Sequence, residues 1–246
     1  MSREPRVVVV TGGGKGIGRA VVARFAAHGD RVVAVGRDRE ALEETDAAAV
    51  EVCDVTDERQ VEALFERIGR TDVLVLSAGA ATSAPLARTG LDDWRAQLDV
   101  NATGAFLCTR AVVGGMVEQG TGRIVTVAST AARIGSRYTA GYTASKHAAV
   151  GLMRAVAAEV AGTGVTANAV CPTYVRTDMT QRSIARIVAA TDRSEEEAEA
   201  ALVASSPLGR LLEPDEVAFA VAFLAAPEAA AINGQTLVLD GGGIQG

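Results

Sequence analysis

Short runs of valine and other apolar residues recur along the chain, and longer segments with apolar residues at helical spacing separate them. Because the runs are continuous rather than alternating with polar residues, they are typical of strands that are buried on both faces of a sheet. Strands are predicted at residues 6–10, 31–35, 49–53, 72–76, 123–128, 165–170 and 236–240. Helices are predicted at residues 17–28, 38–46, 57–69, 92–119, 142–161 and 214–225.

This alternation of strands and helices predicts an α/β fold, in which helices cover both faces of a doubly wound, parallel, seven-stranded sheet. No linker rich in proline, serine or charge divides the chain, so residues 1–246 are predicted to form a single domain. Residues 176–207 break the rhythm with the pattern of one or two amphipathic helices. An insertion there lies beyond the carboxyl ends of the strands, where such folds bind ligands, and is predicted to be a substrate lid.

The segment TGGGKGIG, at residues 11–18, directly follows the first predicted strand and precedes a helix. Glycine permits a tight turn and the close approach of a phosphate, and the free N–H groups of the following helix attract the anion. The segment is not a P-loop, because no serine or threonine follows Lys15, and the strict GxGxxG spacing is absent as well. Its position between a strand and a helix favours a phosphate site over a merely flexible connection.

Tyr142 and Lys146 stand four residues apart in a predicted helix and therefore share one helix face. A free phenol has a pKa near ~10, and a neighbouring ammonium group lowers that value because it stabilises the phenolate. We therefore expect Lys146 to lower the pKa of Tyr142, so that the phenol gives a proton to a carbonyl oxygen or takes one from an alcohol. An isolated pair of this spacing is more often a surface feature, so the assignment depends on the other motifs.

The bulk composition excludes several other classes of protein. The net charge of −6 argues against non-specific binding of nucleic acid. The three cysteines have no metal-type spacing, which predicts buried free thiols in a reducing compartment and no metal site. Neither a signal peptide nor an uncharged apolar stretch of membrane-spanning length is evident, so we expect a soluble cytoplasmic protein. Two histidines without an acidic partner pattern disfavour a Ser-His-Asp hydrolase.

Several motifs then occur in a recognisable order: the glycine-rich turn, CDV at 53–55, LSAG at 76–79, DVNATGAF around Asn101, RIVTVAST with Ser129, YTASK from Tyr142 to Lys146, CPTYVRT at 171–177 and VLDGG at 238–242. Together they resemble the short-chain dehydrogenase/reductase family over essentially the whole chain. The stretch from 120 to 172 is most similar to bacterial β-ketoacyl reductases and aromatic-polyketide ketoreductases. The resemblance implies a Rossmann-type sheet and NAD(P)-dependent chemistry on a carbonyl or secondary alcohol.

The resemblance also implies the roles of particular residues. Ser129, thirteen residues before Tyr142, is expected to hydrogen-bond the reacting oxygen, and Lys146 to hold the nicotinamide ribose. Asn101 is expected to bind a water through a local backbone kink and to extend a proton relay to Lys146. The implied catalytic residues are Asn101, Ser129, Tyr142 and Lys146. The implied cofactor-binding residues are Thr11, Gly12, Gly14, Lys15, Gly16, Ile17, Gly18, Arg37, Asp54, Val55, Ser77, Ala78, Gly79, Tyr142, Lys146, Pro172, Val175 and Thr177.

The end of the second strand bears on the choice of nicotinamide. An NAD enzyme usually has a carboxylate at that strand tip, whereas this chain has Gly36 followed by Arg37. Asp38 fits better as the N-cap of the next helix. Arg37 and Lys15 together form a clamp for a 2′-phosphate, so NADP is favoured over NAD.

When the cofactor is bound, the Asp54 carboxylate is expected to accept a hydrogen bond from the adenine amine, and Val55 is expected to pack on the adenine ring. The segment 77–79 is expected to line the adenosine ribose, and Thr177 to bond the nicotinamide carboxamide.

Two positions depart from the family pattern. Ser77 stands where the family usually has asparagine, and Thr173 stands where it usually has glycine, which adds bulk near the nicotinamide.

Substrate choice is expected to reside in residues 131–138, 173–176 and 178–206. Their apolar members suggest an apolar pocket, and Arg133, Arg137, Arg182 and Arg186 suit the phosphate of a phosphopantetheine or CoA. The favoured function is an NADPH-dependent ketoreductase for a β-ketoacyl thioester or polyketide, carried on CoA or an acyl carrier protein. The alternatives are a dehydrogenase that oxidises a hydroxyacyl-CoA or cyclic alcohol, and a sensor that binds the cofactor without turnover. By resemblance, the protein is expected to be a homotetramer.

Overall fold

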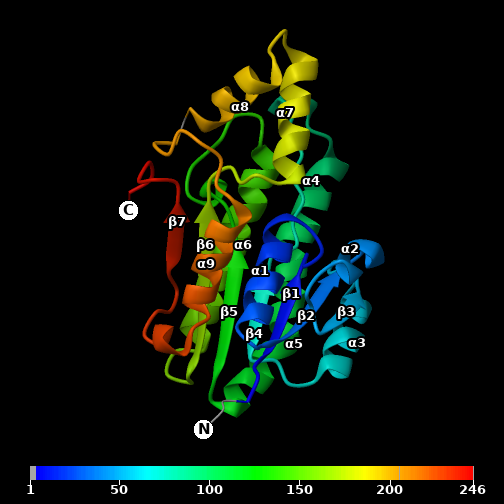
Figure 1. The fold of residues 1–246 in the computed structure, drawn as a ribbon, viewed down its shortest axis with the longest axis vertical. Coiled ribbons are helices and arrows are strands. Elements are labelled where there is room, and N and C mark those ends of the chain that lie inside the picture. The colour runs from blue at the N-terminus through cyan, green and yellow to red at the C-terminus, as the bar shows by residue number, and fades with distance from the viewer. Residues whose placement is uncertain (1–3, 205, 246) are drawn as a thin grey trace.

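The computed structural model describes residues 4–204 and 206–245, and a single parallel sheet runs through its centre (Figure 1). The sheet has seven strands in the order β3-β2-β1-β4-β5-β6-β7. Every predicted strand is present within two residues of its expected limits, which confirms the predicted fold. The strands are β1 (Val7–Thr11), β2 (Arg31–Gly36), β3 (Ala49–Val52), β4 (Val73–Leu76), β5 (Gly122–Val127), β6 (Val165–Pro172) and β7 (Thr236–Leu239).

Helices connect these strands in the order that the sequence predicts. The α-helices are α1 (Gly16–Ala27), α2 (Arg39–Glu43), α3 (Glu58–Ile68), α4 (Leu91–Leu98), α5 (Gly104–Gln119), α6 (Ala140–Glu159), α7 (Asp178–Ala190), α8 (Glu195–Val203) and α9 (Pro214–Leu224). Short 3₁₀ turns are η1 (Leu86–Arg88), η3 (Thr130–Ala132) and η4 (Pro227–Ala229), and η2 (Asp99–Thr103) is a π-helical turn.

Two hydrophobic cores form because neighbouring residues of a strand point to opposite faces of the sheet. In β1, Val9 joins the core beneath α3, α5 and α6, whereas Val8 and Val10 join the core beneath α1 and α9. All three valines are fully buried. The continuous valine runs therefore reflect strands that are covered on both faces, as the sequence pattern indicates.

The single helix predicted at 92–119 is wrong in one respect, because the π-helical turn η2 interrupts it between α4 and α5. Asn101 lies in this turn, and its side-chain amide donates to the Ala80 carbonyl oxygen at 2.8 Å and accepts from the Ala80 N–H at 3.0 Å. Such π-bulges are frequent at functional sites. The run Leu91–Gln119 is apolar and long enough to cross a membrane by composition alone, but its buried side chains belong to the core under the sheet.

The inserted segment folds as two helices, α7 and α8, which rise beyond the carboxyl ends of the strands (Figure 1). A capping box starts α8, in which Ser194 and Glu197 bond each other's backbone N–H groups. Among the helices and strands, α7 and α8 have their main contacts with each other. We call residues 178–203 the lid segment; position 205, within the predicted insertion, lies outside the described residues.

Candidate active site

A cleft of about 700 Å³ lies at the carboxyl ends of β1 to β5, where the strand order reverses between β1 and β4. Ligands of doubly wound folds bind at such a switch point. Most of the expected site residues line this one cleft: Gly12, Gly14, Lys15, Gly16, Ile17, Gly18, Arg37, Asp54, Val55, Ser77, Ala78, Gly79, Tyr142, Lys146 and Thr177.

Three of the expected cofactor-binding residues, Thr11, Pro172 and Val175, do not line this cleft. Thr11 is buried, and its hydroxyl accepts from the N–H groups of Ser77 at 3.1 Å and Ala78 at 3.2 Å, which holds the end of β4 to the end of β1. Pro172 is buried at the end of β6. The carbonyl oxygen of buried Val175 accepts from the Thr177 hydroxyl at 3.3 Å. All three positions are therefore buried supports of the strand ends rather than parts of the cleft surface.

The glycine-rich turn is closed so tightly that Gly18 admits no side chain. A Cβ atom at Gly18 would lie 2.1 Å from the carbonyl oxygen of Gly12, well inside van der Waals contact. The turn leads directly into α1, whose first N–H groups have no partner within the helix and suit an anion. The local structure therefore fits the phosphates of a dinucleotide.

Tyr142 and Lys146 lie in the first two turns of α6, beside the end of β5. The Lys146 side chain is buried, and its Nζ donates to the Val127 carbonyl oxygen at 3.0 Å. The same Nζ lies 5.7 Å from the centroid of the Tyr142 ring. Ser129 follows β5, accepts at its Oγ from the Ala131 N–H at 3.1 Å, and hydrogen-bonds the Tyr142 phenol. The predicted hydroxyl, phenol and ammonium groups therefore come together.

The expected lowering of the Tyr142 pKa is wrong. Burial raises the pKa of Tyr142 because the surrounding protein penalises the phenolate, and the hydrogen bond from Ser129 only partly offsets this effect. Burial also lowers the pKa of Lys146 to about 8. At neutral pH the structure therefore holds a protonated phenol next to an ammonium group, which is the state that a proton donor needs.

Asn101 does not contact Lys146 directly. Its Nδ2 also donates to the buried Ser145 hydroxyl at 2.9 Å, and Ser145 in turn donates to the Tyr142 carbonyl oxygen at 2.8 Å. A Cβ atom at Gly79 would lie 3.1 Å from Asn101 Oδ1 and 3.6 Å from Lys146 Nζ. A cavity of about 10 Å³, the space that one water needs, is lined by Asn101, Lys146 and Val127 among others.

Both cations expected at the adenosine end carry a carboxylate partner. Lys15 Nζ lies 2.6 Å from Asp38 Oδ2, and Arg37 lies 3.7 Å from Asp54 Oδ2. Asp38 also accepts from the Ala41 N–H at 3.2 Å, which confirms it as the N-cap of α2. The Asp54 carboxylate accepts from the Thr56 N–H and hydroxyl, so its expected contact with an adenine amine stays a prediction.

The sequence missed part of the wall that the lid segment contributes. Asp178, Met179 and Arg182 of α7 line the same cleft as the glycine-rich turn. Met179 and Arg182 were assigned to the substrate pocket, because the sequence gives no measure of how far α7 reaches back over the sheet. Their position directly after CPTYVRT is the one signal that places them near the nicotinamide end. Cys53, Val100, Val127 and Ala128 lie within the quoted motifs, but they were not expected to bind the cofactor. The full set of further wall residues is Gly36, Asp38, Ala41, Leu42, Cys53, Val100, Val127 and Ala128.

Comparison with known proteins identifies the group to which this arrangement belongs. Residues 12–243 match the family model described as enoyl-(acyl carrier protein) reductase. A putative ketoacyl reductase of Streptomyces coelicolor is 39% identical over 98% of both chains. D-Threitol dehydrogenase of Mycolicibacterium smegmatis is 38% identical over 96% of this chain and 92% of its own length. A variant of actinorhodin polyketide ketoreductase, solved with NADPH, is 38% identical over 98% of both chains, with a TM-score of 0.91.

The fold, the cleft and these relatives define an oxidoreductase that acts on a carbonyl or alcohol group with a nicotinamide cofactor. The chain belongs to the short-chain dehydrogenase/reductase family, and the resemblance drawn from its motifs is confirmed.

Replacement of Lys146 by methionine tests the electrostatic state of the site. Burial lowers the pKa of Lys146 from 10.5 to about 8, so the folded protein releases this proton near pH 8 while the unfolded chain keeps it to pH 10.5. Stability from this group therefore rises as the pH increases through that window. Lys146→Met is expected to raise the free energy of unfolding at pH 7, and the gain is expected to shrink between pH 8 and 10.5. Urea unfolding of both proteins across this range checks it; a gain independent of pH contradicts it.

Proposed function

We propose that this protein is an NADPH-dependent ketoreductase that uses Ser129, Tyr142 and Lys146 to reduce a ketone to a secondary alcohol. The observation that carries the proposal is that these three side chains meet beside a cleft formed around a glycine-rich turn. When bound, the nicotinamide supplies the hydride for this reduction. The residues of the cleft fit a dinucleotide in shape and charge, and NADPH accompanies the closely similar actinorhodin polyketide ketoreductase.

The chain's own groups then manage the proton and the oxygen of the carbonyl. The raised pKa of Tyr142 keeps its phenol protonated at neutral pH, so Tyr142 serves as the general acid. The Ser129 hydroxyl, next to the phenol, donates to the same oxygen and stabilises the charge that develops there. Lys146, with a pKa of about 8, remains largely an ammonium at pH 7 and favours proton loss from Tyr142 as the carbonyl oxygen gains it.

Return of a proton to Tyr142 is the role we propose for Asn101 and the small cavity. The cavity adjoins both Asn101 and Lys146, and Gly79 leaves open the space between Asn101 Oδ1 and Lys146 Nζ. One water at this place has hydrogen-bonding partners on both sides. Asn101 is buried in the π-helical turn, a kind of helix irregularity that is frequent at functional sites.

The cofactor's 2′-phosphate would be held by Lys15 and Arg37 at the end of β2, which supports NADP over NAD. The diphosphate would lie on the glycine-rich turn, the adenine near Asp54 and Val55, and the ribose along residues 77–79. Tyr142 and Lys146 would hold the nicotinamide ribose, and Thr177 its carboxamide. Thr11, Pro172 and Val175 would support these contacts from behind.

The substrate class that we propose is a β-ketoacyl thioester or polyketide ketone, carried on CoA or an acyl carrier protein. Its support is the similarity to the putative ketoacyl reductase and to a 3-oxoacyl-[acyl-carrier-protein] reductase of Synechocystis, 36% identical over 96% of this chain. The similarity to D-threitol dehydrogenase favours polyol oxidation as the second candidate. A screen of NADPH consumption with thioesters and of NADP⁺ reduction with polyols separates the two.

We also propose that the protein is a cytoplasmic homotetramer. Exposed aromatic side chains on outer helix faces support self-association: Phe106 on α5, and Phe219 and Phe223 on α9. Sedimentation of the purified chain distinguishes a tetramer from a monomer.

Replacement of Tyr142 by phenylalanine separates catalysis from cofactor binding. The change removes the phenolic proton but keeps the ring against the cleft wall, so turnover is expected to fall by about 10²- to 10⁴-fold, the usual range for a lost general acid. The dissociation constant for NADPH is expected to stay within about threefold of the wild-type value. Steady-state kinetics and fluorescence titration measure the two quantities. Unchanged turnover in Tyr142→Phe would contradict Tyr142 as the general acid, and a wild-type protein that binds NADPH without turnover would support a cofactor-binding sensor.

Replacement of Asp38 by asparagine tests Lys15, one of the two cations at the adenosine end. Asparagine caps a helix as well as aspartate does, so α2 is expected to persist, while Lys15 loses its ion-pair partner. Because exposed pairs are weak, kcat/KM with NADPH is expected to rise by no more than about fivefold relative to NADH. The ratio of the two kcat/KM values is the measurement. A fall in this ratio, or a clear preference of the wild-type protein for NADH, contradicts the assignment.

A further inference from the structure

The position of the lid segment depends on the two chain segments that join it to the body of the protein. Among the helices and strands, α7 and α8 have their main contacts with each other rather than with the sheet or its covering helices. The outgoing segment runs from the end of β6 through residues 173–177. The returning segment enters α9 through residues 211–213.

These two segments are paired by their backbones. The Arg176 N–H donates to the Leu212 carbonyl oxygen at 2.8 Å, and the Leu212 N–H donates to the Tyr174 carbonyl oxygen at 2.9 Å. Val175 and Leu212 form a parallel bridge between them. Both residues are buried, so this short ladder is a fixed base from which the lid segment rises.

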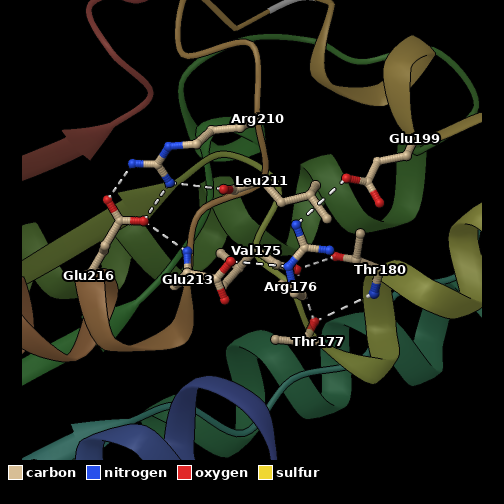
Figure 2. A network of polar contacts seen from close by, with 9 residues as sticks. All are labelled: Val175, Arg176, Thr177, Thr180, Glu199, Arg210, Leu211, Glu213 and Glu216. Carbon is tan, nitrogen blue, oxygen red and sulfur yellow. Dashed lines mark hydrogen bonds and ion pairs between the residues drawn. The ribbon is translucent and has the colours of Figure 1, made fainter. Parts of the chain in front are cut away.

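The Arg176 side chain connects this base to the lid itself, as Figure 2 shows. Its Nε donates to Glu213 Oε1 at 3.0 Å, on the returning segment. Its other end lies 3.7 Å from Glu199 Oε1, on α8. One planar guanidinium group therefore joins the base of the lid segment, the start of α9 and the far lid helix. A planar fork can make two such contacts at once, which a lysine ammonium does less well.

The residue after Arg176 faces the cofactor cleft. Thr177 is the N-cap of α7, and its hydroxyl accepts from the Thr180 N–H at 3.5 Å (Figure 2). Thr177 also touches the glycine-rich turn, because a Cβ atom at Gly16 would lie 3.0 Å from Thr177 Cγ2. Met179 and Arg182 line the cleft from the same helix. A shift of α7 therefore moves the part of the cleft lining that Thr177, Asp178, Met179 and Arg182 form.

We propose that Arg176 is a positioning residue, which through Glu199 and Glu213 holds the lid segment closed over the bound cofactor and slows its release. The inference rests on the proposed place of the cofactor in this cleft. Arg176 touches neither the cleft nor the reacting atoms and acts through Thr177 and α7. Its ion pairs are half-exposed, and such pairs contribute little to overall stability. Their effect is expected in cofactor release rather than in unfolding.

The test is the replacement of Arg176 by glutamine, with cofactor binding as the readout. Arg176→Gln is expected to raise the dissociation constant for NADPH about fivefold, mainly through faster dissociation, as for most changes in affinity. Arg176→Lys is expected to give an intermediate value. Stopped-flow displacement of NADPH from the resting protein gives the dissociation rate, fluorescence titration gives the dissociation constant, and thermal unfolding reports stability.

The matched control is Arg210→Gln. Arg210 is similarly exposed and contacts the same returning segment: it donates to the Leu211 carbonyl oxygen, and its bidentate partner Glu216 accepts from the Glu213 N–H (Figure 2). None of these partners belongs to α7 or α8, so this variant disturbs the returning segment without breaking the contact to the lid segment. This variant is expected to change thermal stability as much as Arg176→Gln does, with NADPH release unchanged. A second variant, Glu199→Gln, is expected to speed release, because it breaks only the contact to α8.

Three outcomes overturn the inference. NADPH release from Arg176→Gln and Glu199→Gln at the wild-type rate shows that the ion pairs do not hold the lid segment. Equal acceleration in Arg210→Gln shows that loosening the returning segment, rather than breaking the ion pair to α8, sets the rate of release. Absence of NADPH binding by the wild-type protein defeats both the proposed function and this inference, whereas normal wild-type binding with unaffected variants defeats this inference alone.

Discussion

The hydrogen bond from the buried Lys146 ammonium to the Val127 carbonyl oxygen is the contact on which the site depends. An ammonium group is costly to bury, and here it has one carbonyl partner and a neighbouring cavity with room for one water. The cost is visible in the pKa of Lys146, which burial lowers to about 8. The carbonyl oxygen at the end of β5 offsets part of this desolvation cost, and the position of Lys146 on α6 keeps the ammonium group close to Tyr142.

The order of the strands explains why these groups meet. The switch between β1 and β4 opens a cleft at the carboxyl edge, and the end of β5 supplies both Val127 and Ser129 next to it. The helix α6 packs against β6 and β5 and delivers Tyr142 and Lys146 from the side. The π-helical turn contributes Asn101 to the small cavity next to Lys146, and the lid segment contributes residues of α7 to the lining of the cleft. These elements together bring the Ser129 and Tyr142 hydroxyls and the Lys146 ammonium group to one place at the carboxyl edge of the sheet.

Most of the fold could be predicted from the sequence because burial on both faces leaves runs such as Val7 to Val10, which no surface strand shows. The motif residues of the cleft were also predictable, since they lie at strand ends or, as Tyr142 and Lys146 do, on one face of a predicted helix. The interruption of the helix at Asn101 was not predicted from the hydrophobic pattern, because the turn DVNAT contains neither proline nor glycine, the usual signals of a break in a helix. The raised pKa of Tyr142 was missed because it depends on desolvation, which requires the packed structure. The ion pairs of Lys15 and Arg37 depend on loop geometry in the same way.

A crystal structure of the protein with NADPH tests the central claim most directly. The account predicts the nicotinamide C4 atom in the cleft beside the Tyr142 hydroxyl, with Lys146 at the nicotinamide ribose and Ser129 turned toward the same side. A nicotinamide ring bound elsewhere, or a Tyr142 hydroxyl directed away from it into solvent, would contradict the account.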